Sequence, residues 1–532
     1  MSIFLETDTL RDEHKVTANL KSFGFLIAVP ASVALLTVTA QLFIFLTQKG
    51  EMESLARLSG KQTHVVCIAY PAQSHIKSLL KLAKLLHIKG IFITFVNTEF
   101  NHKRLLNSGA LQSLDNLPGF RFDTIPDGLP PSDYNSNQDI LALSASLLSK
   151  KLLPPLQSLI ERLSAEVLPV TSILSDAFMP FPTDAAHSLG IPIFSVWTVS
   201  ACGLMGFYQV QNFIEKGLAP MKDENYLTNG VLNTIIDWIP GMKDIRLRDI
   251  PTFFRTTDPD DFMLKYIKEA MANASRSTGH VIHTFDDLEQ EVLNAISSMF
   301  PNVYTIGPQQ LLLNLLESDH EDFKGVGYNL WEEEKTCLQW LDSKEADSVL
   351  YVNFGSLAVL SQEKLVEFGW GLANSNQNFL WIIKPYFIVG ESKTTLGLEF
   401  MECIKGRGFI SSWCPQEQVL DHKSVGGFLT HGGWNSTIES LSAGVPMLCL
   451  PFFGDQMTNC KYMCTEWECG MEVDNNVRRN DVEKLVRVFM EGLEGKNVKR
   501  KAKEWKQMAE KACGPDGSSS RNLNKLIHLL TS

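Results

Sequence analysis

Short apolar runs of strand length alternate with helical patterns from about residue 60 to the C-terminus. Strands that are apolar throughout are typical of parallel sheets, because helices cover both faces of such sheets. The expected strands form two sets, 64–70, 91–97, 172–178, 191–197 and 280–285, then 348–354, 379–384, 408–413, 426–431 and 445–452. This order predicts an α/β fold with two Rossmann-like, doubly wound domains that face each other across a cleft.

A break in the strand pattern separates the two sets. The run VYTIG ends at Pro308, and the acidic segment LLESDHEDFKGVGYNLWEEE follows it. Prolines and charge runs of this kind are typical of connections between domains. The expected organisation is an N-terminal extension over 1–60, a first domain over 61–307, a linker over 308–335, a second domain over 336–510, and a C-terminal helix over 511–532 that packs back on the first domain.

The composition favours an enzyme that acts on small molecules. The chain has 532 residues, of which 44% are hydrophobic, and this is enough for two separate cores. Its net charge of -12 disfavours a nucleic-acid partner, because such binding depends on clustered Lys and Arg. The ten cysteines lack zinc-ligand spacing, so we expect reduced thiols in a cytoplasmic protein.

The N-terminal extension contains a mostly apolar stretch without charges, 22–48. As a helix this stretch is about 40 Å long, which is enough to cross a bilayer. A cleaved signal peptide is disfavoured, because the preceding residues are numerous and partly acidic. Two interpretations stay open: a transmembrane anchor with the catalytic domains on the cytosolic side, or a cytosolic enzyme whose ordinary start lies near Met52.

The segment 413–456 has the features of a nucleotide site. A strand ends at His431, the turn Gly432-Gly433 follows, and a helix opens at Asn435. Glycines let the backbone approach a ligand, and the positive end of a helix dipole favours a diphosphate. Trp413 is suited to stack on a base and Glu439 to accept hydrogen bonds from ribose hydroxyls. Each feature alone is common in structural roles, so only their combination predicts a nucleotide.

Together these residues resemble the plant secondary-product glycosyltransferase box of the family 1 UDP-glycosyltransferases. The matching positions are Trp413, Pro415, Gln416, His422, Gly426, His431, Gly433, Trp434, Asn435, Ser436, Glu439, Gly444, Pro446, Pro451, Asp455 and Gln456. The resemblance covers nearly all of 62–532, and it is strongest to the subfamily of cyanohydrin, iridoid or terpenoid, and cytokinin glucosyltransferases. In one departure, Gly432 stands where the family usually has Cys, and we expect little effect because this residue contributes mainly backbone.

The resemblance implies a UDP-sugar donor and assigns parts of it to nine of the box residues. The uracil is assigned to Trp413 and Gln416, and the ribose to Glu439. The phosphates are assigned to His431, Asn435 and Ser436, and the sugar to Trp434, Asp455 and Gln456. Further donor-binding positions are Ser74, Thr198, Ser356 and Cys414. Galactose-using relatives tend to carry His at the last box position, so Gln456 favours UDP-glucose.

His75 is the predicted catalytic base. It follows the first strand, where the loops of a doubly wound sheet line the ligand crevice. Histidine is suited to take the proton of an attacking alcohol near neutral pH. Asp176, which follows the run SILS, is expected to orient the imidazole and to stabilise its protonated form. The loops PAQSH and ILSDAF resemble the catalytic loops of the family.

The resemblance implies a GT-B fold, with the acceptor bound by the first domain and the UDP-sugar by the second. It also implies inverting transfer of glucose to a hydroxyl of a small hydrophobic metabolite, giving a β-glucoside, without a metal or cofactor. Ser74, Lys77 and Ser78 replace the usual Gly, Asn and Pro. Lys77 is expected to lie beside the base, where it could lower its pKa or narrow the pocket. A catalytically weak relative that binds UDP-sugar or a hydrophobic ligand is therefore the alternative.

Other enzyme classes fit less well. The triplet Asp258-Pro259-Asp260 could be read as a metal-binding DxD, but it lies in a loop-like stretch away from the nucleotide segment. The GxGxxG pattern of dehydrogenases follows neither first strand. The acceptor pocket is expected near 140–155 and 197–215, with apolar residues such as Leu204 and Phe207.

Overall fold

The computed structural model describes residues 62–111, 117–130, 138–317, 327–383 and 396–532. The chain from Thr63 to Ser532 forms one compact unit. The apolar stretch 22–48 lies outside the described residues, and the anchor stays a prediction. Among the helices of the described ranges, none combines the length and the hydropathy needed to cross a membrane.

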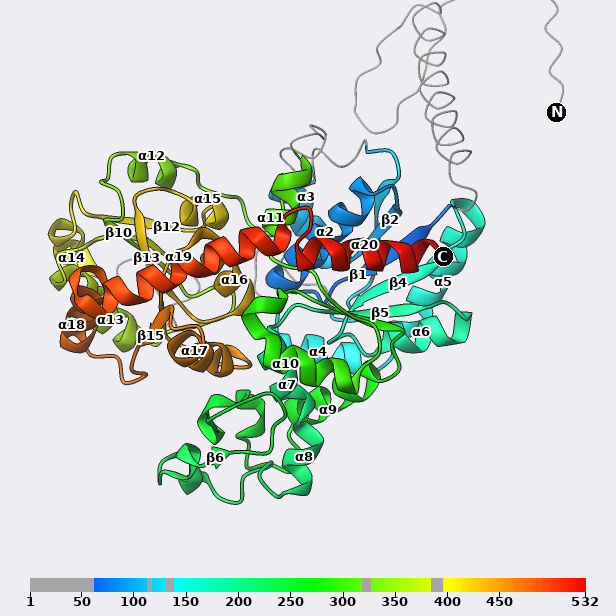
Figure 1. Ribbon diagram of the computed structural model, residues 1–532, viewed down its shortest axis with the longest axis horizontal. Coiled ribbons are helices and arrows are strands. Elements are labelled where there is room, and N and C mark those ends of the chain that lie inside the picture. The colour runs from blue at the N-terminus through cyan, green and yellow to red at the C-terminus, as the bar shows by residue number, and fades with distance from the viewer. Residues whose placement is uncertain (1–61, 112–116, 131–137, 318–326, 384–395) are drawn as a thin grey trace, which may run out of the picture. The chain divides into compact units, whose positions relative to one another are not determined.

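The first sheet has seven strands in the order β3-β2-β1-β4-β5-β8-β9, and all neighbours are parallel. The strands are β1 (His64–Ile68), β2 (Phe92–Thr98), β3 (Phe120–Ile125), β4 (Ser172–Asp176), β5 (Ile193–Trp197), β8 (Gly279–Ile282) and β9 (Val303–Thr305). The helices of this half are α2 (Gln73–Ile88), α3 (Glu99–Asn107), α4 (Ile140–Leu148), α5 (Leu153–Glu166), α6 (Phe181–Leu189), α7 (Ala201–Tyr208), α8 (Val210–Glu215), α9 (Phe262–Ala274) and α10 (Asp286–Met299). Between α8 and α9, the short hairpin β6 (Ile235–Ile236) and β7 (Ile245–Arg246) projects from the sheet (Figure 1).

The second sheet has six parallel strands in the order β12-β11-β10-β13-β14-β15. The strands are β10 (Val349–Asn353), β11 (Asn378–Ile382), β12 (Gly408–Ser411), β13 (Val425–Thr430), β14 (Met447–Cys449) and β15 (Gly470–Glu472). The helices are α12 (Thr336–Asp342), α13 (Gln362–Asn374), α14 (Gly397–Cys403), α15 (Gln416–Leu420), α16 (Trp434–Ala443), α17 (Gln456–Thr465) and α18 (Arg479–Glu491). Every strand expected from the sequence is present, although most are shorter than the apolar run that predicted them.

The strands are buried on both faces, as their apolar composition predicts. In β1, Val65 and Cys67 join one hydrophobic cluster, whereas Val66 and Ile68 join the other. Because side chains alternate across a strand, each strand serves two cores at once. The edge strand β3 was missed because its middle residues are only partly buried and its sequence, FRFDTI, alternates with polar residues.

The connection over 308–335 begins with helix α11 (Gln309–Glu317), which packs on α2. The amide of Gln73 donates to Tyr328 O and Asn329 Oδ1, and its oxygen accepts from Leu330 N. This segment therefore contacts the start of α2 and is more than a spacer. The polar segment alone does not predict that contact, because it depends on where α2 lies.

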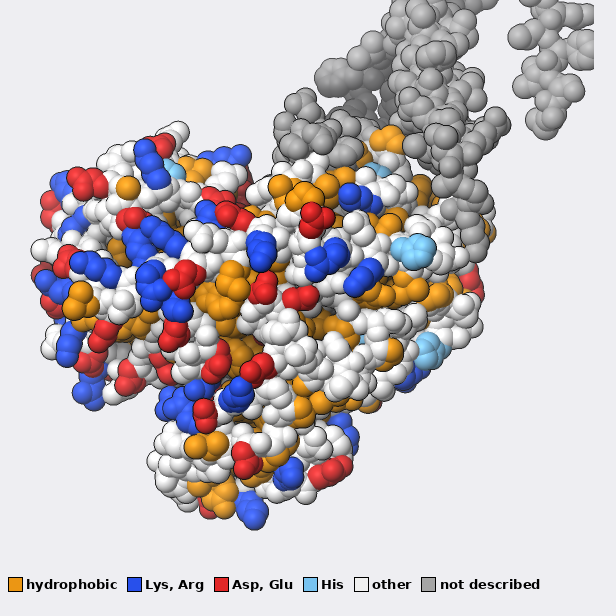
Figure 2. Space-filling model, in the orientation of Figure 1, with side chains coloured by type: hydrophobic (Ala, Val, Ile, Leu, Met, Phe, Trp, Pro, Cys, Tyr) orange, Lys and Arg blue, Asp and Glu red, His pale blue; other side chains and the backbone are white. Residues whose placement is uncertain are grey.

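The C-terminal helices join the two halves (Figure 1). Helix α19 (Leu493–Cys513) packs on α16 and α18 of the second half, and α20 (Ser518–Thr531) packs on β9 of the first. Ser519 Oγ donates to Gly307 O at 2.5 Å, and Asn522 Nδ2 donates to Thr305 Oγ1 at 2.7 Å. Over α18 and α19, the face in Figure 2 carries Lys and Arg among Asp and Glu, which differs from the single-sign basic patches of nucleic-acid-binding proteins.

Candidate active site

The cavity with the predicted residues lies at the carboxyl ends of both sheets. In each sheet the strand order reverses between two neighbours, β1 and β4 in the first and β10 and β13 in the second. Doubly wound sheets bind ligands at such switch points. The cavity measures about 180 Å³. Every predicted donor residue lines it, namely Ser74, Thr198, Ser356, Trp413, Cys414, Gln416, His431, Trp434, Asn435, Ser436, Glu439, Asp455 and Gln456.

The turn before α16 has the conformation that the sequence indicates. Gly432 has φ +78°, which glycine adopts readily, and Gly433 is the N-cap of the helix. A Cβ on Gly432 would lie 2.7 Å from Cys449 Sγ, so the turn is also closely packed. The first N–H groups of a helix have no acceptor within it. With Asn435 and Ser436 lining the cavity, the start of α16 is suited to a phosphate.

The predicted uracil and ribose residues share one hydrogen-bond network. Gln416 Nε2 donates to Glu439 Oε2 at 2.9 Å and to Ser436 Oγ at 3.0 Å. Its Oε1 accepts from Tyr351 and from Asn353 Nδ2. These contacts hold the Gln416 amide and the Glu439 carboxylate in fixed orientations. Asn353, at the end of β10, was not singled out in the sequence, although its place after an apolar strand is the usual position of a site residue.

His431 and Trp413 are both largely shielded from solvent. Burial lowers the pKa of His431 to about 4, so its imidazole is neutral near pH 7. Its Nδ1 has no hydrogen-bond partner in the part of the chain that the structure describes. The ring of Trp413 packs against that of Trp331, with centroids 5.0 Å apart. Both residues nevertheless line the cavity.

The residues predicted to meet the sugar lie at the start of α17 and α16. Burial raises the pKa of Asp455 to about 6, and Asn459 Nδ2 donates to its Oδ2 at 2.9 Å. Gln456 Oε1 accepts the N–H groups of two loop residues, 452 and 453, which leaves its amide nitrogen for a ligand. Trp434 also lines the cavity, but its indole N–H donates to His283 O at 2.6 Å and so ties α16 to the first half.

His75 and Asp176 lie next to one another beside this cavity. His75 is in the first turn of α2, and Asp176 is the last residue of β4, the neighbour of β1. His75 Nδ1 is 2.7 Å from Asp176 Oδ2 and 2.8 Å from Thr198 Oγ1. Asp176 is fully buried, and its other oxygen accepts from Phe178 N. The Nε2 atom of His75 is therefore the one that is left for a substrate.

Thr198 has a contact that the sequence did not indicate. It was predicted only as a donor residue, yet its hydroxyl reaches the imidazole of His75 as well as lining the cavity. The two residues are 123 positions apart, and they come together because β4 pairs with both β1 and β5. The rings of Tyr70 and Phe178 pack around His75, with centroids 4.9 and 6.1 Å from the centroid of its imidazole.

The expectation that Lys77 lies beside the base is wrong. Its Nζ is 2.5 Å from Glu417 Oε1 and 2.8 Å from Glu439 Oε1. On a helix, residues two positions apart point to different sides, so Lys77 faces α15 and α16 while His75 faces Asp176. The ammonium therefore lies beside Glu439, the predicted ribose residue.

Two other sequence features lie away from the cavity. Leu204 and Phe207 are buried in the core and do not line it, although Phe207 packs on Phe178, which contacts His75. Asp260 is 84% exposed and pairs with Lys265 at 2.6 Å. The acidic triplet is thus a solvated turn, as the sequence favoured.

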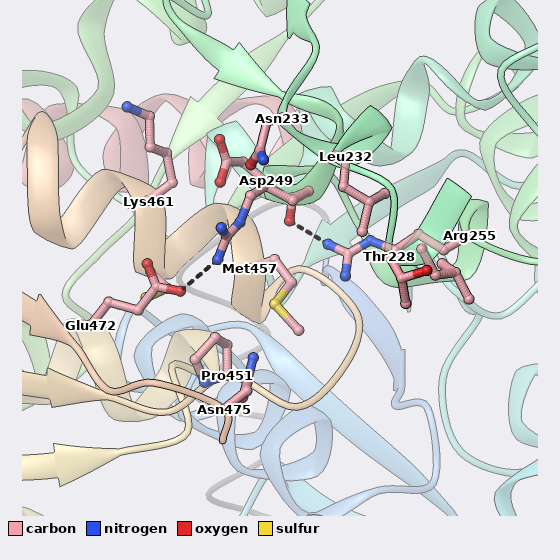
Figure 3. A pocket seen from close by; sticks show the side chains of 14 residues that line it. Thr228, Leu232, Asn233, Asp249, Arg255, Pro451, Met457, Lys461, Glu472 and Asn475 are labelled. Carbon is pink, nitrogen blue, oxygen red and sulfur yellow. Dashed lines mark hydrogen bonds and ion pairs between the residues drawn. The ribbon is translucent and has the colours of Figure 1, made fainter. Parts of the chain in front are cut away.

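A second cavity, of about 310 Å³, lies against α17 (Figure 3). It is lined by the loop around Thr228 and Asn233 and by Met457, Lys461 and Glu472. Arg248 Nη2 lies 3.4 Å from Glu472 Oε1 across it. It contains no predicted site residue, and its mixed charges do not point to one ligand.

The chain is similar in sequence to known glucosyltransferases. The family model described as UDP-glucoronosyl and UDP-glucosyl transferase matches residues 259–503. The 7-deoxyloganetin glucosyltransferase of Catharanthus roseus is 54% identical over 476 residues, which cover 89% of this chain and 97% of that protein. The (R)-mandelonitrile beta-glucosyltransferase of Prunus dulcis is 51% identical over 471 residues, covering 88% and 97%.

Solved structures give the same result. The structure of a UDP-glucosyltransferase from Polygonum tinctorium capable of glucosylating indoxyl matches with a TM-score of 0.73 and 28% identity, covering 88% of this chain and 99% of that one. The structure of a UDP-glucose:anthocyanidin 3-O-glucosyltransferase in complex with UDP matches with a TM-score of 0.74 and 26% identity, with the same coverage.

Proposed function

Because the chain belongs to the family of UDP-glucoronosyl and UDP-glucosyl transferases, we propose that it transfers glucose from UDP-glucose to a hydroxyl of a small hydrophobic plant metabolite. The chain is a UDP-glycosyltransferase, a glucosyltransferase of the plant family 1 enzymes. Its two parallel, Rossmann-like sheets form the α/β GT-B fold. The acceptor, the stereochemistry and the roles of individual residues are parts of the proposal.

The observation that carries the proposal is the position of the His75–Asp176 pair. It lies at the switch point of the first sheet, beside a cavity lined by all the predicted donor residues of the second. A base at one side of a nucleotide-sugar site is the arrangement that glycosyl transfer to an alcohol requires. We assign acceptor binding to 61–307 and donor binding to 336–510, joined by the linker 308–335 and by the C-terminal helix in 511–532.

In the proposed reaction, His75 Nε2 takes the proton of the acceptor hydroxyl as its oxygen attacks the anomeric carbon. Asp176 stabilises the imidazolium that forms. The bond from the anomeric carbon to the diphosphate oxygen breaks, and UDP departs on the opposite side, so the configuration inverts from α to β. The start of α16 and the side chains of Asn435 and Ser436 stabilise the departing diphosphate.

The acceptor is proposed from the relatives. Their names specify 7-deoxyloganetin and (R)-mandelonitrile, and we infer an acceptor of similar kind for this chain. Iridoid and cyanohydrin aglycones, other terpenoid alcohols and cytokinins form the panel to test. We further propose that the reaction needs no metal, because the positive helix end and neighbouring donors already face the diphosphate.

The test is release of UDP by the purified full-length chain over this panel, with UDP-glucose or UDP-galactose and with or without EDTA. We expect turnover with UDP-glucose on at least one acceptor, unchanged by EDTA, with a β-linked product. Loss of turnover in EDTA that Mg²⁺ restores would disprove metal independence. UDP binding without turnover on any acceptor would favour the weak binding relative instead.

The stretch 22–48 concerns only the location of the enzyme. We propose a cytoplasmic enzyme, and the alternative is that this stretch tethers the catalytic part to the cytosolic face of a membrane. The full-length chain should then remain in the membrane pellet after alkaline carbonate extraction. Recovery in the supernatant would favour the plain cytosolic enzyme. A variant without 1–51 is the matched control, since its catalysis should not change.

A further inference from the structure

Lys77 links α2 of the first half to the predicted ribose residue of the second. Its ammonium lies between two carboxylates, 2.5 Å from Glu417 Oε1 and 2.8 Å from Glu439 Oε1. The side chains of Lys77, Glu417 and Glu439 are only 12%, 20% and 7% exposed, respectively. Charge pairs that are shielded from water in this way interact much more strongly than surface pairs.

The ionisable groups of this cluster are matched in number, two lysines to two glutamates. Lys81 also contacts Glu417 Oε1, at 2.6 Å, so two ammonium groups face two carboxylates. Burial alone would lower the pKa of Lys77, but the attraction of Glu417 and Glu439 outweighs it and raises the pKa. Burial raises the pKa of Glu417, but both lysines outweigh it and lower the pKa to about 2. Removing Lys77 alone leaves one net negative charge in the cluster.

Lys77 and Gln416 hold the Glu439 carboxylate from two directions. Oε1 receives the ammonium of Lys77, and Oε2 receives the amide of Gln416 at 2.9 Å. Each carboxylate oxygen can accept more than one hydrogen bond. The carboxylate is therefore fixed in orientation and still has acceptor capacity for two ribose hydroxyls.

Neighbouring contacts fix Lys77 itself. Ser78 Oγ donates to Asn435 Oδ1 at 2.8 Å, and Asn435 Nδ2 donates to Ser74 O at 2.6 Å. The first two turns of α2 thus contact the start of α16, where the diphosphate is proposed to bind.

We propose that Lys77 is a positioning residue for the donor, which holds Glu439 for the ribose hydroxyls and makes α2 part of nucleotide recognition. This inference rests on the proposed donor site, because it takes Glu439 as the ribose residue. It assigns to the first half of the chain a role in donor affinity that the glycosyltransferase box does not contain.

The experiment is calorimetric titration of the full-length chain with UDP and with 2′,3′-dideoxy-UDP. We expect the wild type to bind UDP more tightly by about tenfold or more, since hydrogen bonds to a charged group contribute about 1.5–3 kcal/mol. Lys77→Gln should weaken UDP binding and reduce this preference at least threefold, whereas Lys77→Arg should retain most of it. In turnover, Lys77→Gln should raise the KM for UDP-glucose and leave kcat nearly unchanged.

Lys81→Gln is the matched control, because Lys81 pairs with Glu417 and its removal should leave the ribose preference unchanged. If Lys77→Gln does not fold, Lys77→Gln/Glu417→Gln replaces it, since this pair removes one charge of each sign. The inference is overturned if Lys77→Gln prefers UDP over 2′,3′-dideoxy-UDP as strongly as the wild type does, or if it binds UDP more tightly than the wild type. The inference is also overturned if the wild type transfers glucose but binds UDP no more tightly than 2′,3′-dideoxy-UDP. That outcome leaves the proposed function intact. A wild type that binds no UDP overturns both.

Discussion

Gly355 lies directly against the imidazole ring of His431. A Cβ atom on Gly355 would be 2.6 Å from Cε1 of that ring, and the glycine has φ +78°. The loop after β10 therefore comes as close as the backbone allows to the histidine at the end of β13. Glycine at this position sets where His431 lies in the cavity.

Gly355→Ala should consequently weaken UDP binding by about tenfold or more and lower the free energy of unfolding by about 1–3 kcal/mol, because the new methyl group displaces His431. Calorimetric titration with UDP and urea unfolding measure the two effects. Gly217→Ala is the control: it has φ +67° but nothing within 4 Å of the added Cβ. Gly217→Ala should lower the free energy of unfolding and leave the affinity for UDP unchanged. Equal UDP affinity in both variants would contradict the prediction.

Loss of the base should abolish transfer and spare donor binding. For His75→Gln we expect kcat to fall about a hundredfold to ten-thousandfold, the usual contribution of a positioned general base. Asp176→Asn should also reduce kcat, because the imidazolium loses its stabilising charge. UDP affinity, measured by calorimetry, should stay within about threefold in both, since neither residue is assigned to the nucleotide. His187→Gln, which changes an exposed histidine, is the control.

Donor binding should depend on pH through Asp455. Burial raises the pKa of this carboxyl from 3.8 to about 6, so it is ionised above that pH and protonated below it. The ionised form accepts hydrogen bonds from sugar hydroxyls through both oxygens, and protonation weakens these bonds because it removes the charge and turns one oxygen into a donor. The KM for UDP-glucose should therefore rise as the pH falls from 7 to 5, while UDP affinity changes much less. Asp455→Asn should remove this dependence, and an unchanged slope in that variant would refute the assignment.

Gln456 should determine affinity for the sugar rather than for the nucleotide. Its side-chain oxygen accepts two backbone N–H groups from the preceding turn, so its amide nitrogen is the part that can reach a sugar hydroxyl. Gln456→Ala should raise the KM for UDP-glucose about tenfold, the value of one hydrogen bond at a buried site. Inhibition by UDP should be nearly unaffected. A parallel loss of UDP inhibition would instead indicate that the turn over 452–456 has been displaced.

The sequence predicted the fold through patterns that reflect burial. Strands such as β1 and β13 are covered by helices on both sides, and this forces long apolar runs that are visible without a structure. The weaker elements, β3 and β15, lie at sheet edges, where fewer neighbours demand apolar side chains. The donor segment was predictable because its glycines, helix start and polar residues follow one another within 413–456.

The tertiary structure decided the contacts between distant segments. The sequence named His75 and Asp176 separately, but only the pairing of β1 with β4 joins them. The sequence also marked Lys77 as unusual and placed it wrongly, beside the base. Its true partners, Glu417 and Glu439, are more than 300 residues away along the chain and come close only because α2 packs against the second half. The spacing of residues along a helix determines which side of it each residue occupies. Which other element packs on that side depends on the fold of the whole chain.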